Sequence, residues 1–393
     1  MNLEPNRIAE YVMMFCVLFF TTVMLLIYLR HRKVLGDTKR TRFEPTISVV
    51  IPAYNEEKAI EETVRSVLDA DYPKGKMEVI VVNDGSTDRT AKIVGSIKDK
   101  RVRLLNKKNE GNAAYSKNYG IKRSKGEIII TLDADSTITK DSIKKMLHYF
   151  KDDVAAVTSA VKVKEDERVT FWEKLQKLEY LFTIFNRRLF AMINGVYVTP
   201  GPFSAFRREV FDEVGLFDPT NFMEDQEIAL RIQAANYRIE SCMDAVVYTR
   251  VPKDFRSFMK QRERWNRGGM RNAVKYAFTI NPKYGDFGLF VMLYSILSIV
   301  LLIVVSVVVA TAISEGNMFF LENPLWYIEP IHVLSVMVFG ITLAWIVVAL
   351  KELNEMKIKK RYILIYTILY CYLITLFVFI AIFKELRGER QTW

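Results

Sequence analysis

The chain has 393 residues, a formal net charge of +11 and 50% hydrophobic residues, a balance typical of one sizeable soluble domain joined to membrane segments. Its three cysteines exclude a framework of disulfides, and its three scattered histidines argue against a histidine-based zinc site. The positive charge requires no nucleic acid, because basic residues beside anionic lipid and an anionic substrate account for it.

The first long apolar run covers Tyr11–Leu29. It is close to the roughly 20 residues that a helix needs to cross a bilayer. It is longer than the core of a secretory signal, and the basic stretch Arg30–Lys33 follows it in place of a small-residue cleavage site. We interpret this run as a retained membrane anchor.

Between residues 46 and 132, short runs of β-branched residues alternate with helical patterns over short loops. This alternation predicts a parallel, doubly wound sheet of the kind that commonly holds a nucleotide. The expected strands are 46–52, 77–82, 102–105 and 128–132, and the expected helices are 59–68, 90–97 and 112–122.

Two carboxylates, Asp133 and Asp135, follow the strand that ends at Leu132. Ligands of open α/β sheets bind at the carboxyl ends of the strands, and two aspartates with one small residue between them can reach toward a common point. Their hard oxygen atoms suit Mg²⁺ or Mn²⁺, which binds through one or two carboxylates plus substrate phosphates. The alternative is a solvated turn, where aspartate is common.

Asp84 follows the strand 77–82 in a polar turn that leads into the helix 90–97. Its carboxylate is a candidate to hydrogen-bond a base or a ribose at the same sheet edge. The alternative is that Asp84 and Asp88 only cap this helix.

After Asp135 the alternation is less regular. Apolar residues recur at helical spacing between Phe171 and Leu189 with basic residues among them, which predicts a basic amphipathic helix. Such a helix lies in the bilayer interface or packs on the domain core, and both positions stay open. The other expected elements are strands at 154–163, 203–206 and 244–248, a helix at 224–235 and an amphipathic stretch at 255–278.

Asp225 lies at the start of the predicted helix 224–235. The helix dipole favours the ionised carboxylate there, which suits a general base within reach of an acceptor hydroxyl. The alternative is that Glu224 and Asp225 only balance the dipole.

Gln261, Arg264 and Trp265 are spaced to share one face of a helix. A guanidinium group can bind phosphate through two hydrogen bonds, and an indole ring offers a flat platform for a sugar. The alternative for Trp265 is an anchor at the membrane interface, where tryptophan is enriched.

Three further apolar runs cover residues 287–313, 331–350 and 362–383. Basic residues follow the first span and lie between the last two, whereas the loop 314–330 has three glutamates and neither Lys nor Arg. The positive-inside rule then makes segment 30–286 cytoplasmic and puts the tail with Lys384 and Arg387 outside, in mild conflict with the rule. The expected domains are an anchor over 1–30, a cytoplasmic domain over 31–286 with interface helices at about 171–190 and 254–280, and three transmembrane helices over 287–393.

In this order the motifs resemble the membrane-bound family 2 glycosyltransferases with a GT-A fold, the group of cellulose, chitin, hyaluronan and poly-N-acetylglucosamine synthases. The resemblance covers residues 47–269, and the most specific segment, Gln261–Trp265, resembles the QxxRW signature of the processive members. The other matching segments are 50–56, 82–88, Asp133–Asp135, Gly201-Pro202, Phe206–Arg208 and Glu224-Asp225.

The resemblance implies a role for each matching residue. Asp133 and Asp135 would form the nucleotide and metal site, with Asp135 the surer ligand of Mg²⁺ or Mn²⁺. Asp225, with Glu224 beside it, would act as the base of an inverting transfer. Arg264 would bind the diphosphate, while Trp265 would stack on the acceptor sugar beside Gln261. The residues that would contact the uracil and ribose of a UDP-sugar are Pro52, Tyr54, Glu56 and Asp84.

The chain departs from this family at Gly111–Ala113, where many members carry Gly-Lys-Ala with the lysine near the diphosphate. The nearest cations are Lys107, Lys108 and Lys117, so the phosphate contacts of this segment stay open. The four predicted spans are also fewer than in the best-known synthases. A polymer channel would therefore need a homo-oligomer or an accessory subunit, or does not exist.

Three functions stay open. The first is extension of a polysaccharide from UDP-GlcNAc or UDP-glucose, favoured by the Gln261–Trp265 motif. The second is transfer of one sugar to a lipid, as in ceramide glucosyltransferase-like enzymes, favoured by the small number of spans. The third is a non-catalytic membrane protein that binds a nucleotide sugar, against which Asp133, Asp135 and Asp225 argue.

Overall fold

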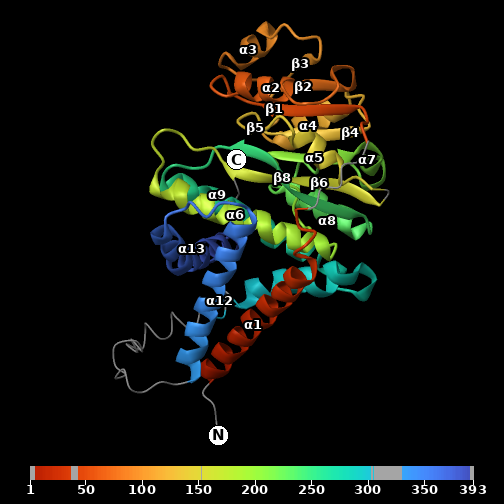
Figure 1. The fold of residues 1–393 in the computed structure, drawn as a ribbon. Helices are drawn as coiled ribbons and strands as arrows, with labels where there is room; N and C mark the ends of the chain where they lie inside the picture. Colours follow the sequence, from red (N-terminus) through yellow and green to blue (C-terminus); the bar gives the residue numbers. More distant parts are fainter. Residues whose placement is uncertain (1–4, 37–42, 152, 302–303, 305–329, 390–393) are drawn as a thin grey trace.

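The computed structural model describes residues 5–36, 43–151, 153–301, 304 and 330–389. At its centre is an eight-stranded mixed sheet with the strand order β3-β2-β1-β4-β7-β6-β8-β5. Helices cover both faces of the sheet, and apolar helices extend from one end of this α/β domain (Figure 1). The predicted α/β fold with a mixed sheet is confirmed.

The first half of the sheet is parallel, as the sequence predicts. β1 lies between β2 and β4, and β3 pairs with β2. β1, β2 and β4 are almost entirely buried, which is usual for parallel strands covered by helices on both faces. The strands are β1 (Ile47–Ala53), β2 (Met77–Asp84), β3 (Val102–Lys107) and β4 (Ile128–Leu132), and the helices are α2 (Ile60–Leu68), η1 (Lys74–Lys76), α3 (Thr90–Ser96) and α4 (Ala113–Ile121).

The second half of the sheet reverses direction at β7, which runs antiparallel to both β4 and β6. Leu132 at the end of β4 is paired with Phe203 at the start of β7, so the residues that follow β4 lie beside those that precede β7. β8 begins at Arg238 and not at the predicted Asp244, and the short helices α5 and α7 were not predicted. The elements are β5 (Thr137–Ile138), α5 (Ser142–Leu147), β6 (Val154–Val163), β7 (Phe203–Arg207), α7 (Arg208–Val214), α8 (Glu224–Ala234) and β8 (Arg238–Thr249).

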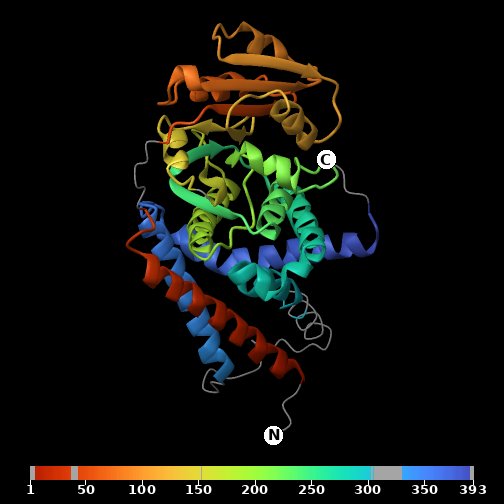
Figure 2. The ribbon, with the colours of Figure 1, turned by 90° about the vertical axis from the view of Figure 1, so that its right-hand side faces the viewer.

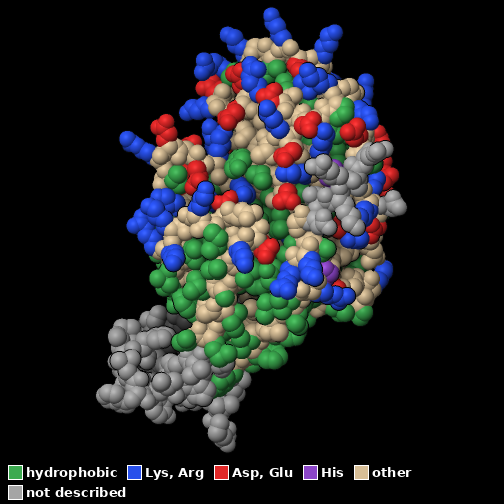
Figure 3. Space-filling view, in the orientation of Figure 1, with side chains coloured by type: hydrophobic (Ala, Val, Ile, Leu, Met, Phe, Trp, Pro, Cys, Tyr) green, Lys and Arg blue, Asp and Glu red, His purple; other side chains and the backbone are tan. Residues whose placement is uncertain are grey.

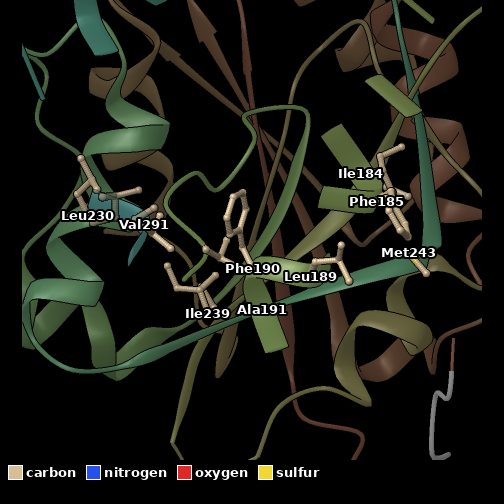
Figure 4. Close-up of a cluster of buried hydrophobic side chains, with 14 of the residues drawn as sticks. Ile184, Phe185, Leu189, Phe190, Ala191, Leu230, Ile239, Met243 and Val291 are labelled. Atoms are coloured by element: carbon tan, nitrogen blue, oxygen red, sulfur yellow. The ribbon is translucent and has the colours of Figure 1, made fainter. Parts of the chain in front are cut away.

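Two hydrophobic cores lie on opposite faces of the sheet. One contains side chains of α2 and α5, such as Val64 and Met146. The other contains side chains of α4, α6 and α8 and continues without a break into the apolar helices. Figure 4 shows part of this second core, where Phe185 and Leu189 lie close to residues of β8. The sheet domain and the apolar helices are therefore packed as one body.

Helix α6 (Phe171–Met192) separates the sheet from the apolar helices. It begins with a capping box formed by Thr170 and Glu173. Its apolar face is buried in the second core, so the predicted amphipathic helix packs on the domain, one of the two positions that the sequence left open. Arg188 donates hydrogen bonds to the carbonyl oxygen of Leu35 at 3.0 Å and to the carboxylate of Glu240 at 3.0 Å, which ties the segment after α1 to β8.

The apolar helices are α1 (Pro5–His31), a shorter helix over Phe287–Leu301 whose first turns form the π-helical stretch η4 (Phe287–Met292), α12 (Pro330–Glu352) and α13 (Lys360–Leu386). Among the described residues, two are long and apolar enough to cross a membrane: Met14–His31 within α1, and α13. Most of the predicted span 287–313 beyond Leu301 lies outside the described residues. Of the four predicted spans, two are therefore supported by length and composition.

Helix α13 does not run alongside α1 and α12. In Figure 2 it passes beneath the sheet domain, while α1 and α12 point away from the domain. Both of its ends contact the domain: Lys174 of α6 donates to the hydroxyl of Tyr362, and Lys384 is paired with Glu263 of α9 (Phe255–Lys275) at 2.8 Å. In Figure 3, hydrophobic side chains gather on the lower part of the visible face, over the apolar helices.

The predicted position of the tail, on the opposite side of the membrane from the domain, stays a prediction. Glu385 accepts hydrogen bonds from Arg267 and Arg271 of α9, so the last turn of α13 lies against the domain. These ion pairs favour a tail on the same side as the domain, which would remove the conflict with the positive-inside rule. Charge counts along the sequence could not show that an apolar helix returns to the domain that it leaves.

This arrangement predicts that the tail and the domain are exposed on one side of the membrane. We expect an impermeant maleimide to label Arg387→Cys and Lys125→Cys in vesicles of the same orientation, in a chain whose three native cysteines are replaced by alanine. Both positions are exposed in the structure. Labelling of the two variants in vesicles of opposite orientation would show that α13 crosses the membrane.

Candidate active site

Three parallel strands, β1, β2 and β4, end at the same edge of the sheet, and the predicted site residues follow them there. Asn55 adopts a left-handed conformation with φ of 56°, and its backbone N–H donates to Ser86 at 3.0 Å. This contact joins the loop after β1 to the loop after β2. Tyr54 in the first loop is half-exposed, and Pro52 is half-buried at the end of β1.

Asp84 is the last residue of β2 and is buried. Its carboxylate accepts a hydrogen bond of 2.5 Å from Lys107 on β3, which also pairs with Glu110. Near the start of α3, Asp88 accepts a hydrogen bond from the backbone N–H of Thr90 at 2.9 Å, but the N-cap position is Arg89 and it has no side-chain cap. Neither aspartate is therefore the N-cap of α3, and Asp84 stays at the sheet edge.

Glu56, Asp133 and Asp135 bring several negative charges to this edge. Burial raises the pKa of Asp133 to about 7, with the charge of Lys117 opposing and that of Asp135 adding to the rise. Burial and the charge of Asp135 likewise raise the pKa of Glu56 to about 7. Carboxylates that repel one another in this way favour a bound cation.

Asp135 points toward the end of β8. Its Oδ1 accepts hydrogen bonds from Ser136 at 3.2 Å and from Thr249 at 3.4 Å. Burial raises the pKa of Asp135 although these hydroxyl groups oppose the rise. The two aspartates are thus held by different neighbours, Asp135 by β8 and Asp133 by the loop before β7.

Gly201, in that loop before β7, lies between Asp133 and Asp225, the predicted nucleotide-site carboxylate and the predicted base. Its backbone N–H donates to Oδ2 of Asp225 at 3.4 Å. A methyl group at Gly201 would lie 3.3 Å from Oδ2 of Asp133 and 3.7 Å from Nζ of Lys117. Thr199 also binds the backbone carbonyl of Asp225, at 2.7 Å. Asp133 and Asp225, far apart in the sequence, therefore share one small space at Gly201.

Lys117 is the cation at the centre of this space. It is buried to 2% exposure on α4, and its Nζ donates to Oε1 of Glu224 at 2.9 Å. Burial lowers the pKa of Lys117, but the charges of Glu224 and Asp133 outweigh burial and raise it. The same pair holds the pKa of Glu224 below its ordinary value despite burial, whereas burial and the charge of Glu224 raise the pKa of Asp225. The environment thus lowers the pKa of Glu224 and raises the pKa of the adjacent Asp225.

Of the three residues predicted to share a face of α9, Arg264 and Trp265 act at this space and Gln261 does not. Trp265 lines a cavity together with Asp225, and the charge of Arg264 acts on Glu224 and Asp225. Gln261 instead accepts a hydrogen bond of 2.6 Å from Arg262. The guanidinium group of Arg262 lies 4.0 Å from the centre of the Trp265 ring, so Gln261 supports the tryptophan through this arginine.

The donor set at the edge fits a hard divalent cation held jointly with a ligand. Within the described ranges there is no group of three or more His, Cys, Asp or Glu side chains that would hold a metal ion. Mg²⁺ and Mn²⁺ are commonly held by one or two carboxylates plus phosphate oxygens, which is what Asp133 and Asp135 offer. A zinc site built from protein side chains alone does not fit.

Residues 48–215 match the model of the Glycosyl transferase family 2. This segment of the chain is similar to that family. It is 29% identical over 255 residues to the poly-beta-1,6-N-acetyl-D-glucosamine synthase of Staphylococcus aureus, a match that covers 63% of this chain and 60% of that enzyme. It is 27% identical over 286 residues to the probable glycosyltransferase YdaM of Bacillus subtilis, covering 70% of this chain and 67% of that protein. The chain thus aligns with about 60% of the length of the first of these relatives.

The fold of the chain also resembles a solved structure. The mannosyltransferase PcManGT of Pyrobaculum calidifontis, in complex with GDP-Man and Mn²⁺, matches over 97% of this chain and 100% of that chain with a TM-score of 0.66 and 21% identity. At this identity the likeness shows the fold alone. The GT-A-like fold that the resemblance implied is confirmed.

Three charged residues of the site were missed or left open by the sequence. Lys117 lies three residues after Ala114 and four before Ile121, on the buried face of α4. A lysine at such a position requires an anionic partner, and this signal would have identified it. Arg187, which lines the cavity of Asp225 and Trp265, and Arg250, whose charge acts on Glu56 and Asp135, carry no comparable signal in the sequence.

The Lys117–Glu224 pair is testable through stability. We expect Lys117→Met to lower the free energy of unfolding by about 3 to 5 kcal/mol, because it leaves Glu224 buried without its cation. The folded-state pKa of Glu224 is below the unfolded value, so the ion pair stabilises the folded protein at neutral pH. This stabilisation is lost as the pH falls through the folded-state pKa of Glu224. Denaturant unfolding in detergent measures the change.

A double variant provides the control. Lys117→Met combined with Glu224→Gln removes both charges of the pair and should recover part of the lost stability, while Asp133 and Asp225 still lack the cation. Lys122→Met, at the exposed end of the same helix, should leave stability unchanged. Equal stability of the single variant and the wild type would contradict a buried ion pair.

Proposed function

We propose that this chain transfers a hexose or N-acetylhexosamine from a nucleoside diphosphate sugar to an acceptor hydroxyl at the membrane, with inversion. The observation that carries the proposal is the meeting of Asp133 and Asp225 at Gly201. One carboxylate follows a strand at the ligand-binding edge of the sheet, and the other begins a helix. The match of residues 48–215 to the family model and the similarity to poly-beta-1,6-N-acetyl-D-glucosamine synthase support the reaction class.

The donor nucleotide binds along the ends of β1 and β2 in this proposal. Glu56 and Asp84 hydrogen-bond the ribose and the base, and Tyr54 and Pro52 contact the base. The exposed ring of Tyr54 and the buried carboxylate of Asp84 support this division. A UDP-sugar is the first candidate donor. Because the structural neighbour holds GDP-Man, GDP-sugars belong in the same screen.

Asp135 and Asp133 would hold Mg²⁺ or Mn²⁺ together with the diphosphate of the donor. The ion supplies neutralisation of the charge that develops on the leaving nucleotide. Arg264 adds a second positive group near the same phosphates, and Lys117 lies close to Asp133. This cluster supports departure of the nucleotide as an anion.

Asp225 acts as the general base. The acceptor oxygen forms a bond to C1 of the sugar as the bond between C1 and the diphosphate oxygen breaks, and the hydroxyl proton passes to Asp225. The raised pKa of Asp225 makes it a better proton acceptor than an ordinary aspartate once it is ionised. Glu224, held ionised by Lys117, keeps the neighbouring charge constant.

For the acceptor, extension of a polysaccharide is the first candidate. The Gln261–Trp265 motif supports it, because Trp265 lines the same cavity as Asp225 and a sugar ring can stack on it. Transfer of a single sugar to a lipid is the second candidate. It is favoured by the apolar lining of the same cavity, which reaches the apolar helices.

We place the domain, residues 31–286, on the cytoplasmic side of a multi-pass membrane protein. Arg30, Arg32 and Lys33 follow α1 and support this orientation. The short helix at Phe287–Leu301 and α12 would add to the membrane region. A channel for a long polymer would require a second copy or an accessory subunit.

The base assignment yields a direct prediction. Asp225→Asn should lower turnover by about a hundredfold to ten-thousandfold, since it removes the proton acceptor. Binding of the nucleotide should change little, because Asp225 is not among the residues assigned to it. Purified protein incubated with labelled UDP- and GDP-sugars and Mn²⁺, with mass analysis of the products, measures donor choice and product length together.

Asp212→Asn, at an exposed acidic residue of α7, is the matched control and should behave as the wild type. Normal turnover by Asp225→Asn would contradict the assignment of Asp225 as the general base. A wild-type protein that binds nucleotide sugars but forms no product under any condition would favour a non-catalytic binding protein.

A further inference from the structure

Helix α9 contributes more to the candidate active site than the side chains of its predicted motif. Gly268 and Asn272 lie about one and two turns after Trp265, on the same face of the helix, and both are buried. This face packs against the segment 221–226, which contains Asp225. The helix that presents the tryptophan is therefore in direct contact with the segment that presents the proposed base.

Asn272 is fully buried and joins α9 to this segment through three hydrogen bonds. Its amide group donates to Oε1 of Gln226 at 3.1 Å and to the backbone carbonyl of Met223 at 3.4 Å. Its Oδ1 accepts a hydrogen bond from the amide group of Asn221 at 2.7 Å. One asparagine thus binds the residues on both sides of the pair Glu224-Asp225.

Gln226 connects Asn272 to the carboxylate of Asp225. The backbone N–H of Gln226 donates to Oδ1 of Asp225 at 2.8 Å and to the backbone carbonyl of Met223 at 3.1 Å. The orientation of the Asp225 carboxylate therefore depends on the position of this turn, and Asn272 holds the turn against α9.

Gly268 allows the close approach of α9 to the same turn. A methyl group at Gly268 would overlap Cγ of Met223 and lie 3.1 Å from its Cβ. A methyl group at the adjacent Gly269 would lie 3.7 Å from Oε1 of Gln226, which is an ordinary van der Waals separation. The two neighbouring glycines of one helix thus differ, because Gly268 faces Met223 directly.

Helix α13 holds α9 from another side. Arg267, the neighbour of Gly268, is buried to 2% exposure, and its Nε donates to Glu385 at 2.5 Å. Arg271 donates to the same carboxylate at 3.0 Å. These ion pairs resist a movement of α9 away from a larger residue at position 268. The overlap would therefore displace the segment that leads into Asp225.

We propose that Asn272 and Gly268 are positioning residues, which fix the start of α8 on α9 so that Asp225 and Trp265 line the same cavity in the orientation that transfer requires. Neither residue contacts the donor or the acceptor. This inference rests on the proposed function, in which Asp225 is the base. A displacement of about 1 Å of a reacting group can cost about a hundredfold in rate, so this packing controls turnover.

The two glycines provide a matched pair of variants in the full chain. Gly268→Ala should lower kcat by about tenfold to a hundredfold in the assay with labelled nucleotide sugars and Mn²⁺. The KM for the donor and the affinity for UDP with Mn²⁺ should stay unchanged, because the ends of β1, β2 and β4 are not displaced. Gly269→Ala adds the same methyl group to the same helix and should behave as the wild type.

A second substitution tests whether the effect arises at Met223. Met223→Ala removes the atom that the new methyl group would overlap. The double variant Gly268→Ala with Met223→Ala should therefore recover most of the turnover that Gly268→Ala loses. A general loss of packing would not be repaired by a second truncation.

Asn272→Ala tests the hydrogen bonds without adding bulk to α9. It should lower kcat by about tenfold or more and leave the KM for the donor unchanged. Thermal unfolding of each variant establishes that it is folded at the assay temperature. If Gly268→Ala does not fold, Asn272→Ala provides the same comparison of kcat with KM.

The outcomes separate this inference from the proposed function. Normal kcat in the folded variants Gly268→Ala and Asn272→Ala, beside an active wild type, overturns the inference alone. Equal losses in Gly268→Ala and Gly269→Ala without recovery by Met223→Ala also overturn it, as does a rise in the KM for the donor in place of a fall in kcat. A wild type that turns over no nucleotide sugar overturns the proposed function and the positioning role with it.

Discussion

The candidate site depends on one buried cation. Nζ of Lys117 is 2.9 Å from Glu224, and the charges of Asp133 and Asp225 act on it as well. Three carboxylates so close together in a buried space would repel one another and take up protons without a cation among them. Lys117 keeps Glu224 ionised and limits the repulsion at Asp133. It thereby lets the end of β4, the Gly201 loop and the start of α8 meet.

The sheet explains why these segments can meet. The reversal at β7 pairs Leu132 with Phe203, so the residues after β4 lie directly beside the residues before β7. Gly201 takes the position between two carboxylates, where a larger side chain would contact both Asp133 and Lys117. Helix α6 forms one wall of the cavity beside this site and carries both Arg187 and Arg188.

Much of this fold could be predicted from local patterns. The bounds of β4 and β6 match the predicted strands, because short runs of buried β-branched residues have few alternatives. Asp133, Asp135 and Asp225 were singled out because each follows a strand or begins a helix. The early part of β8 was not predicted, since Arg238 and Glu240 interrupt its apolar pattern and are paired with partners distant in the sequence.

Tertiary relations account for what the sequence did not reveal. The sequence did not distinguish Lys117 from Lys107 and Lys108. The fold does, because it brings Lys117 of α4 to Glu224 of α8. Arg187 differs from Arg188 only in which neighbours the fold supplies. The path of α13 depends on ion pairs between Glu385 and two arginines of α9, and no hydropathy pattern contains this information.

Titration of the full chain with Mn²⁺, followed by electron paramagnetic resonance with and without UDP, tests most directly whether these carboxylates form one nucleotide and metal site. The account predicts weak Mn²⁺ binding to the protein alone, much tighter binding once UDP is present, and loss of the UDP-dependent gain in Asp135→Asn. Mn²⁺ affinity that is indifferent to UDP, or a gain that survives in Asp135→Asn, would contradict it.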